Sequence, residues 1–352
     1  MDGRNKRITL AQIALEAGVS RTTVSMALRN HPRVSADTCR RIQELAALRN
    51  FRPDPVLSAV AMKRAGHGRN PRGNTAFLSF RNPFSPKSSP PSGNTTLEYL
   101  GAREAAGKRG CHMDHFFIED PQSCASVERM LWHRGVSGVI FCQIFDREVI
   151  SGVNWSRFSV VGADVGHITP PCHQVRFDWI RSVAMAWERA WGMGYRRIGL
   201  ALLDEPGAVD IVDKFGSGSF DALRRAKPAD RIPPGLFGLD DRERFFRWYR
   251  EHRPDVVMGF TSTVRDWMTG GGLSVPGDAA FISLYLNGDY TGDDTAGIQG
   301  PNRELGSRAF QLLETLMRSN ERGFVEAPMI YMMPMIWRDG ASCPKKGKRL
   351  KR

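Results

Sequence analysis

The sequence predicts an all-α head of three helices joined to an α/β body of two parallel-sheet subdomains. Up to residue 52 the apolar residues recur at helical spacing, whereas from Thr75 onward short apolar runs alternate with amphipathic segments. The charge divides in the same way. Of the net charge of +13, residues 1–73 carry +9 and residues 345–352 carry +6, which leaves −2 for the body. Basic ends on a near-neutral body indicate a nucleic-acid-binding head on an unrelated body.

The head begins with two short helices joined by a tight turn. Thr9 and Gln12 form a T-x-x-Q capping box, and Gly18 ends the first helix because glycine tolerates the left-handed backbone of a helix C-terminus. Ser20 is expected to cap the second helix, whose apolar residues include Val24. This spacing predicts a helix-turn-helix, which presents its second helix to a DNA major groove.

A third helix should close the core of the head. Ser35 is its expected cap, and its apolar face is expected to comprise Val34, Ile42, Leu45 and Leu48. Residues 53–64, PDPVLSAVAMKR, have one apolar stripe and are too short to form a stable isolated helix. We expect this segment to fold only against a partner or on DNA. Residues 65–74 read as a flexible linker.

The body alternates predicted strands and helices. We expect strands at 75–80, 112–118, 136–144, 158–165, 196–203, around Leu236, 256–260, 279–286 and 329–337. We expect helices at 97–110, 126–135, 179–194, 218–226, 242–252, 263–268 and 303–323, with a loop before Asp178, which caps the third of them. These strands are too many for one sheet, so two subdomains with a ligand site between them are predicted.

These elements predict the domain boundaries. The head spans 1–52, the hinge helix and linker 53–74, the body 75–342 and a basic tail 343–352. Within the body we expect an N-subdomain of about 75–165 plus 295–325 and a C-subdomain of about 166–294 plus 326–342. Two interpretations of the tail stay open, a solubilising end and non-specific attraction to phosphates.

Several classes of protein are disfavoured. The chain has no apolar run long enough for a membrane span and no apolar secretory stretch after Met1. Its six cysteines show no C-x-x-C spacing, which favours reduced thiols in a cytoplasm. The motif C-H-M-D-H at 111–115 lies on a predicted strand, which would split its donors between two faces, so we expect no metal. We expect no cofactor. We also expect that the protein is not an enzyme, because no convincing nucleophile–base pair is present.

The head resembles the lactose-repressor/galactose-repressor (LacI/GalR) family of bacterial transcription regulators. The segments that carry the resemblance are ITLAQIALEAGVSRTTVSMALRN, PRVSADT and FRPDP, and in the body VVGAD, MGYRRIGLAL, RPDVVMGF, VPGDAAFIS and PMIWRDGAS. It implies a periplasmic-binding-protein-like body, a homodimer on a near-palindromic double-stranded operator, and a cytoplasmic, nucleoid-associated repressor controlled by a small, sugar-like molecule. Two alternatives stay open. One is a relative that binds DNA constitutively or under the control of a protein partner, and the other is a DNA-tethered enzyme.

The resemblance also implies residues for the DNA interface. Arg21 and Thr22 should face base edges, where an arginine pairs with guanine. The residues implied in contacts with the DNA backbone are Ser20, Thr23, Ser25, Arg29, Arg33 and Thr38. Met26 stands where the family often has an arginine, so we expect an altered operator sequence. It either touches a thymine methyl group or packs within the head.

In the hinge, Val60 stands where the family inserts an apolar wedge into the minor groove, with Leu57 one turn earlier. Both residues either kink the DNA or pack between two hinge helices. The Asp54-Pro55 pair at the start of the hinge departs from the family pattern.

The effector site departs further from the family. Asp164 stands where relatives have an aspartate near the sugar, and it either contacts the effector or caps a loop. Thr261 stands where an asparagine is common, Leu286 where an aspartate is common, and the usual arginine has no equivalent near residues 214–220. The aromatic candidates for stacking on an effector, each of which could instead be core, are Phe84, Trp179, Trp267 and Tyr285.

Overall fold

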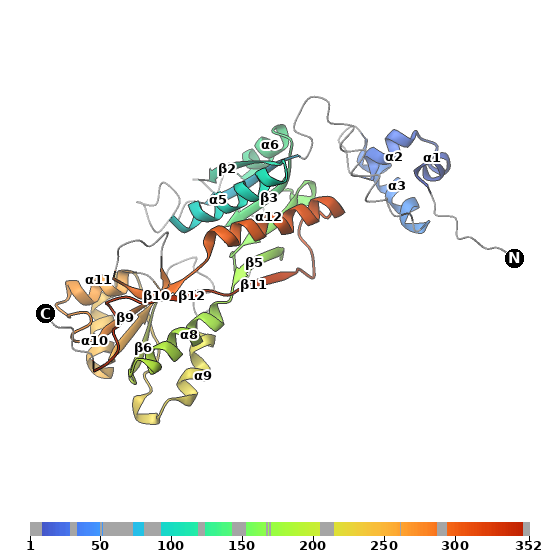
Figure 1. Cartoon of the computed structure of the whole chain (residues 1–352). Coiled ribbons are helices and arrows are strands. Elements are labelled where there is room, and N and C mark those ends of the chain that lie inside the picture. Colours follow the sequence, from blue (N-terminus) through green and yellow to red (C-terminus); the bar gives the residue numbers. More distant parts are fainter. Residues whose placement is uncertain are drawn as a thin grey trace.

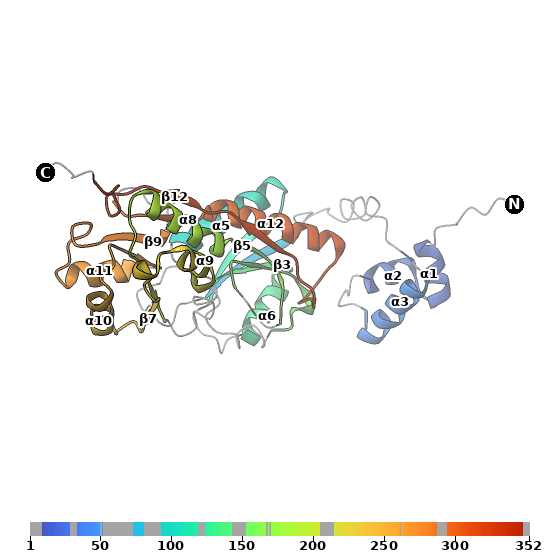
Figure 2. The same ribbon diagram turned by 90° about the horizontal axis from the view of Figure 1, so that it is seen from below.

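The structure is a computed structural model of the whole chain. It describes residues 9–28, 34–49, 51, 73–80, 93–118, 124–142, 153–166, 168, 170–204, 215–260, 262–286 and 294–347. Figures 1 and 2 show the three-helix head beside a body of two lobes. Within the described part of the chain, no helix is both long and apolar enough to cross a membrane.

The head consists of α1 (Leu10–Ala17), α2 (Arg21–Ala27) and α3 (Ala36–Leu48). The predicted capping box of α1 is confirmed. The backbone N–H of Thr9 donates to Gln12 Oε1 at 2.8 Å, and the backbone N–H of Gln12 donates to Thr9 Oγ1 at 3.4 Å. Gly18 ends the helix at φ 66°, in the left-handed region that the prediction requires. Local chemistry therefore places the turn between the two helices.

The core of the head is small and well closed. Ile13, Val24 and Ile42, one from each helix, are fully buried. The Gln43 side chain also donates to the carbonyl of Ala27 at 3.0 Å, which ties α3 to the end of α2. The prediction for Leu48 is wrong. Its side chain is 82% exposed, because it lies on the last turn of α3, beyond the reach of the other two helices.

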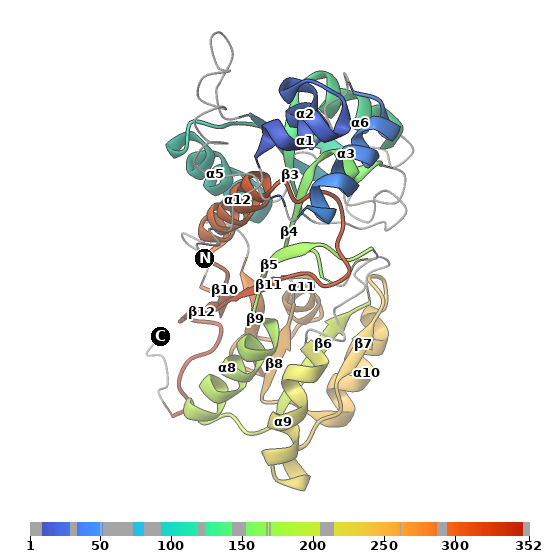
Figure 3. The same ribbon diagram turned by 90° about the vertical axis from the view of Figure 1, so that its right-hand side faces the viewer.

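The first lobe of the body is built on a six-stranded parallel sheet with the order β11-β5-β4-β3-β1-β2. Its strands are β1 (Asn74–Phe80), β2 (His112–Ile118), β3 (Val136–Cys142), β4 (Ser159–Ala163), β5 (His173–Phe177) and β11 (Ile330–Met333). Helices α5 (Gly93–Lys108) and α12 (Asn302–Ser319) pack on one face, and α6 (Cys124–His133) packs on the other (Figure 3). The face that carries α5 and α12 belongs to the larger apolar core.

The second lobe has a six-stranded sheet with the order β12-β10-β9-β8-β6-β7. Its strands are β6 (Ile198–Leu203), β7 (Gly235–Phe237), β8 (Val256–Gly259), β9 (Ala280–Leu286), β10 (Ala296–Gln299) and β12 (Ile336–Arg338). Its helices are α8 (Trp179–Gly192), α9 (Ser217–Arg225), α10 (Arg242–His252) and α11 (Ser262–Gly270). Pairing is parallel except between β10 and β12, which is antiparallel. The expectation of two parallel-sheet subdomains is thus confirmed with one antiparallel edge strand.

The chain crosses between the lobes three times, and these crossings correct the predicted subdomain boundaries. β5 pairs with β4, so the first lobe extends to residue 177 rather than 165. β10 pairs with β9, so the second crossing follows residue 299 rather than preceding 295. The single strand expected at 329–337 is two strands, and β11 belongs to the first lobe although 326–342 was assigned to the second. The last error concerns a strand whose partner is distant in sequence, because β11 pairs with β5.

Two glycines let α5 and α12 cross at backbone contact. A Cβ atom at Gly101 would lie 1.8 Å from the carbonyl oxygen of Arg303, and one at Gly306 would lie 1.8 Å from that of Glu98. Any larger residue would force the helices apart. The close crossing fixes the first turns of both helices beside the second lobe, where the polar cluster described below is found.

Candidate functional site

The N-terminal turn of α2 presents the residues expected to read DNA. Arg21 and Thr22 are exposed, whereas Val24 and Ala27 on the opposite side of the helix are buried in the head. Met26 is half-buried, which is compatible both with contact to a thymine methyl group and with packing within the head. The exposed face of α2 therefore begins at its N-terminus, where unpaired backbone N–H groups and the helix dipole favour an anion.

Two helix N-termini of the head carry the same Ser-x-x-Thr cap. Ser20 Oγ accepts the backbone N–H of Thr23 at 3.0 Å and shares a hydroxyl hydrogen bond with Thr23 Oγ1 at 2.8 Å. Ser35 and Thr38 repeat the arrangement on α3, at 3.3 Å and 2.7 Å. Each pair uses one of its two hydroxyl hydrogens internally, so one hydroxyl donor in each remains for an outside acceptor. Ser25 on α2 is half-buried.

The other DNA candidates, Arg29, Arg33, Leu57 and Val60, lie outside the described residues, as do the hinge segment 53–64 and two effector candidates, Phe84 and Thr261.

Asp164 and Trp179 link the two lobes. Asp164 follows β4 of the first lobe in a left-handed conformation, φ 50°. Trp179 opens α8, which packs on the second sheet. The indole N–H of Trp179 donates to both carboxylate oxygens of Asp164, at 3.0 and 3.1 Å, and the backbone N–H of Phe177 donates to Oδ1 at 3.2 Å. The carboxylate of Asp164 thus accepts hydrogen bonds from the segment in which the chain first passes from one lobe to the other.

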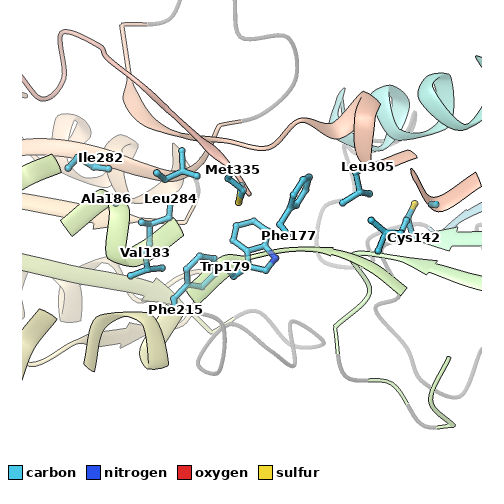
Figure 4. Close-up of a cluster of buried hydrophobic side chains, with 14 of the residues drawn as sticks. Cys142, Phe177, Trp179, Val183, Ala186, Phe215, Ile282, Leu284, Leu305 and Met335 are labelled. Carbon is cyan, nitrogen blue, oxygen red and sulfur yellow. The ribbon is translucent and has the colours of Figure 1, made fainter. Parts of the chain in front are cut away.

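Trp179 packs as core. It is 4% exposed, and the rings of Phe177, Phe215, Phe260 and Tyr285 surround it, with centroids 5.1 to 6.1 Å away. Figure 4 shows Trp179 and Phe177 between side chains of the two lobes. Trp267 is also buried, in the second lobe. In this arrangement neither indole offers an open face for stacking.

A second link between the lobes is a chain of polar side chains. The hydroxyl of Tyr285, on β9, donates to Asn302 Oδ1 at 2.8 Å. Asn302, the first residue of α12, donates from Nδ2 to Asn94 Oδ1 at 3.1 Å. Tyr285 is half-buried and stacks on Phe260, with ring centroids 5.9 Å apart and 6° between the planes. Asn302 and Asn94 were not predicted as site residues.

Glu98, on α5, lies in the same region and was also missed. It is 4% exposed, and within the described part of the chain its Oε2 atom has no hydrogen-bond partner. Burial first, and the negative charge of Asp164 second, raise the pKa of Glu98 well above its usual value. Burial, Glu98 and Asp164 likewise raise the pKa of Tyr285, and burial and Glu98 raise that of Cys142. The cluster is therefore acidic and electrostatically coupled.

One signal in the sequence could have revealed Glu98. It shares a helical stripe with Gly101, Ala102 and Ala105, all of which are buried, so a carboxylate occupies an otherwise small and apolar face. Leu286, by contrast, ends β9 as a fully apolar residue that is 2% exposed.

The side chains of C-H-M-D-H take separate partners on β2. His112 Nε2 pairs with Asp114 Oδ1 at 2.8 Å on one side of β2, while His115 Nε2 lies 2.7 Å from Ser79 Oγ. In the part of the chain that the structure describes, no group of three or more His, Cys, Asp or Glu side chains is arranged to hold a metal ion.

A helix-turn-helix head on a two-lobed α/β body defines a DNA-binding transcription regulator. Residues 9–54 match the family described as "Bacterial regulatory proteins, lacI family". This match covers the head and the first residues after it. No curated protein matches the chain.

Solved structures of similar fold extend the comparison to the body. The complex of transcriptional regulator CelR with cellobiose is 16% identical, with a TM-score of 0.57, and covers 96% of this chain and 100% of its own. The Lac repressor dimer bound to operator and the anti-inducer ONPF is 18% identical, with the same TM-score and coverage. CCPA from Weissella paramesenteroides with bound glucose is 13% identical, with a TM-score of 0.57, and covers 78% of this chain and 100% of its own. These likenesses establish the periplasmic-binding-protein-like fold of the body.

Proposed function

We propose that this regulator is a sequence-specific repressor whose operator affinity is controlled by a small molecule bound between the two lobes. The observation that carries the DNA-binding half is the exposed N-terminal turn of α2, with Arg21 and Thr22 outward and the opposite face buried. Arg21 and Thr22 would read base edges, and Met26 would meet a thymine methyl group. The contacts to phosphate would come from Ser20, Thr23, Ser25, Arg29, Arg33 and Thr38.

A homodimer on a near-palindromic operator fits this head. A three-helix domain of this size offers one recognition helix, and two copies related by a two-fold axis would meet two half-sites. Leu57 and Val60 of the hinge would enter the minor groove at the operator centre and kink the DNA. The Lac repressor structure, a dimer bound to operator, supports this arrangement by its similar fold.

The effector half rests on the two links between the lobes. Trp179–Asp164 and Tyr285–Asn302 are hydrogen bonds between groups on different lobes, so a ligand that remakes them binds two lobe arrangements differently. Such differential affinity is what couples a ligand to DNA binding. The similar CelR and CCPA structures contain cellobiose and glucose, which supports a sugar-like effector near Asp164 and Tyr285.

A second candidate function is control by a protein partner, or no control at all. The observation that favours it is Leu286, a buried apolar residue at the end of β9, where the family commonly has an aspartate.

The test has two steps. The full chain is used to select bound DNA from a random pool, and small molecules are then screened for their effect on binding to the selected operator. A palindromic consensus and at least one molecule that changes affinity are expected. Enrichment of no sequence would refute specific binding. A palindrome with no response to any molecule would favour the second candidate.

A further inference from the structure

Glu98 lies where α5 crosses α12. Its carbonyl oxygen lies against Gly306, so the helix crossing of α5 and α12 fixes its backbone. Its neighbours in the coupled cluster come from three other elements: Asp164 after β4, Cys142 at the end of β3 and Tyr285 on β9. All three are acids or weak acids, so nothing in this set neutralises the carboxylate.

Asp164 and Tyr285 already have hydrogen-bond partners other than Glu98. The Asp164 carboxylate accepts from Trp179 and the backbone of Phe177, and the Tyr285 hydroxyl donates to Asn302. Among the described residues, Glu98 Oε2 is left without a donor although the side chain is more than nine-tenths buried. A buried carboxylate oxygen with no partner is costly, and native proteins rarely retain one without a purpose.

We infer that the site between the lobes takes a ligand that carries a cationic amino group, with Glu98 as the counter-ion of that group. This inference rests on the proposed effector site and specifies the chemical class of its ligand. An ammonium group supplies the hydrogen-bond donor that Glu98 Oε2 lacks and a positive charge that offsets the negative charge of the cluster. A neutral hydroxyl group could supply a donor but no positive charge, so it would not favour the ionised form of Glu98.

The direction of proton linkage follows from the same contacts. Burial and Asp164 raise the pKa of Glu98, so in the ligand-free protein its carboxyl group holds a proton to higher pH than usual. A bound ammonium favours the ionised form, so it lowers that pKa and displaces the proton. Affinity for the amine should therefore rise with pH as Glu98 ionises, as long as the amine itself stays protonated.

The first experiment compares matched pairs of ligands on the full-length protein. The probes are glucosamine with glucose, galactosamine with galactose, and 1,4-diaminobutane with 1,4-butanediol, measured by thermal shift and isothermal titration calorimetry. At least one amine should bind about tenfold or more tightly than its hydroxyl counterpart, as expected for a buried charge pair. Titration in buffers of different ionisation enthalpy should show proton release on binding.

The second experiment uses two variants of α5. Glu98→Gln keeps the shape and removes the charge, so the preference for the amine should fall by about tenfold or more. Glu104→Gln is the control, because it makes the same substitution on the same helix at an exposed side chain that pairs with Arg303, and it should leave ligand binding unchanged. Thermal melting establishes that each variant folds. If Glu98→Gln does not fold, the inference is tested on the unmodified protein alone. It then stands if an amine is preferred and protons are released on binding, and it is overturned if either is absent.

The outcomes separate this inference from the proposed function. Equal binding of both members of every pair, or an unchanged preference in a folded Glu98→Gln variant, would overturn the role of Glu98 while leaving an effector site in place. Binding of neutral sugars alone would do the same. Binding of no compound in the panel would overturn the inference and count against effector control as well.

Discussion

The crossing of α5 and α12 can be tested directly, because the two helices can approach so closely only with glycine at Gly101 and Gly306. In Gly306→Ala the new Cβ atom would lie 1.8 Å from the carbonyl oxygen of Glu98, about 1.6 Å short of the 3.4 Å at which ordinary contact begins. The obstructing atom belongs to the backbone, so no side-chain rotation relieves the clash. Helix α12 must move away from α5, and the first turns of both helices, with Asn302 and Asn94, must separate.

The size of the effect follows from the kind of atom involved. Overpacking a core by one methyl group typically costs about 1–3 kcal/mol when side chains adjust. Here two helices must shift, so we expect a loss at the upper end of that range in the free energy of unfolding. The matched control is Gly107→Ala, on α5 itself, whose Cβ atom would meet nothing within 4 Å. Alanine at that position should stabilise the helix by up to about 0.5–1 kcal/mol.

Urea unfolding of the two variants and the unmodified protein, followed by far-ultraviolet circular dichroism, measures both changes. The same preparations are titrated with the effector found in the operator screen, and Gly306→Ala should weaken its binding. A Gly306→Ala variant as stable as the unmodified protein would show that the two backbones do not meet as described. Destabilisation of Gly107→Ala to a similar extent would show that glycine matters in these helices for another reason.

Three further predictions concern the DNA and the boundary between the lobes. Arg21→Ala should relax base preference at one operator position by about 1–3 kcal/mol, measured on single-base operator variants; equal weakening on random DNA would mean that Arg21 contacts phosphate only. Val60→Gly should reduce operator bending, measured by gel mobility of circularly permuted fragments, and unchanged bending would count against the wedge. Tyr285→Phe removes the hydroxyl that donates to Asn302 and should lower stability by about 1 kcal/mol. It should also change effector affinity, and a variant unaltered in both properties would show that this hydrogen bond does not join the lobes in solution.

The head was predictable because its determinants are local. Thr9 bonds Gln12 three residues away, Ser20 bonds Thr23, and Gly18 supplies a backbone conformation that other residues rarely adopt. Leu48 shows where local periodicity ends. It continues the apolar repeat of α3, yet it is exposed because no part of α1 or α2 extends far enough to cover it.

In the body, the alternation of strands and helices was predictable from the sequence. The points at which the chain crosses between the lobes were not. Residues 173–177 lie in a segment predicted as loop, and they become β5 because β4 and β11, the latter more than 150 residues later, pair with them. Pro334 separates β11 from β12, and the two strands join different sheets. A strand that depends on a distant partner carries little local signal, so the subdomain boundaries could not be placed from the sequence.

The candidate site was also predictable only in part. Asp164 and Trp179 were singled out separately as effector candidates, and the structure shows that they bond to each other. Glu98 was missed because its surroundings are tertiary: α5 crosses α12, about 200 residues later in the sequence, at Gly306. Sequence patterns find residues of the right type, whereas the pairing of these residues is decided by the tertiary contact of the two lobes.

The links between the lobes are of the size that regulation needs. One neutral hydrogen bond contributes about 0.5–1.5 kcal/mol and one to a charged group about 1.5–3 kcal/mol, so Tyr285–Asn302 and Trp179–Asp164 together hold the lobes by a few kcal/mol. A coupling of about 1–3 kcal/mol changes an affinity by about 5–150-fold. A ligand that breaks or remakes these two contacts would therefore be sufficient to switch DNA binding. Glu98 lies in the same electrostatic network as both links, so a charge placed beside it would act on the boundary directly.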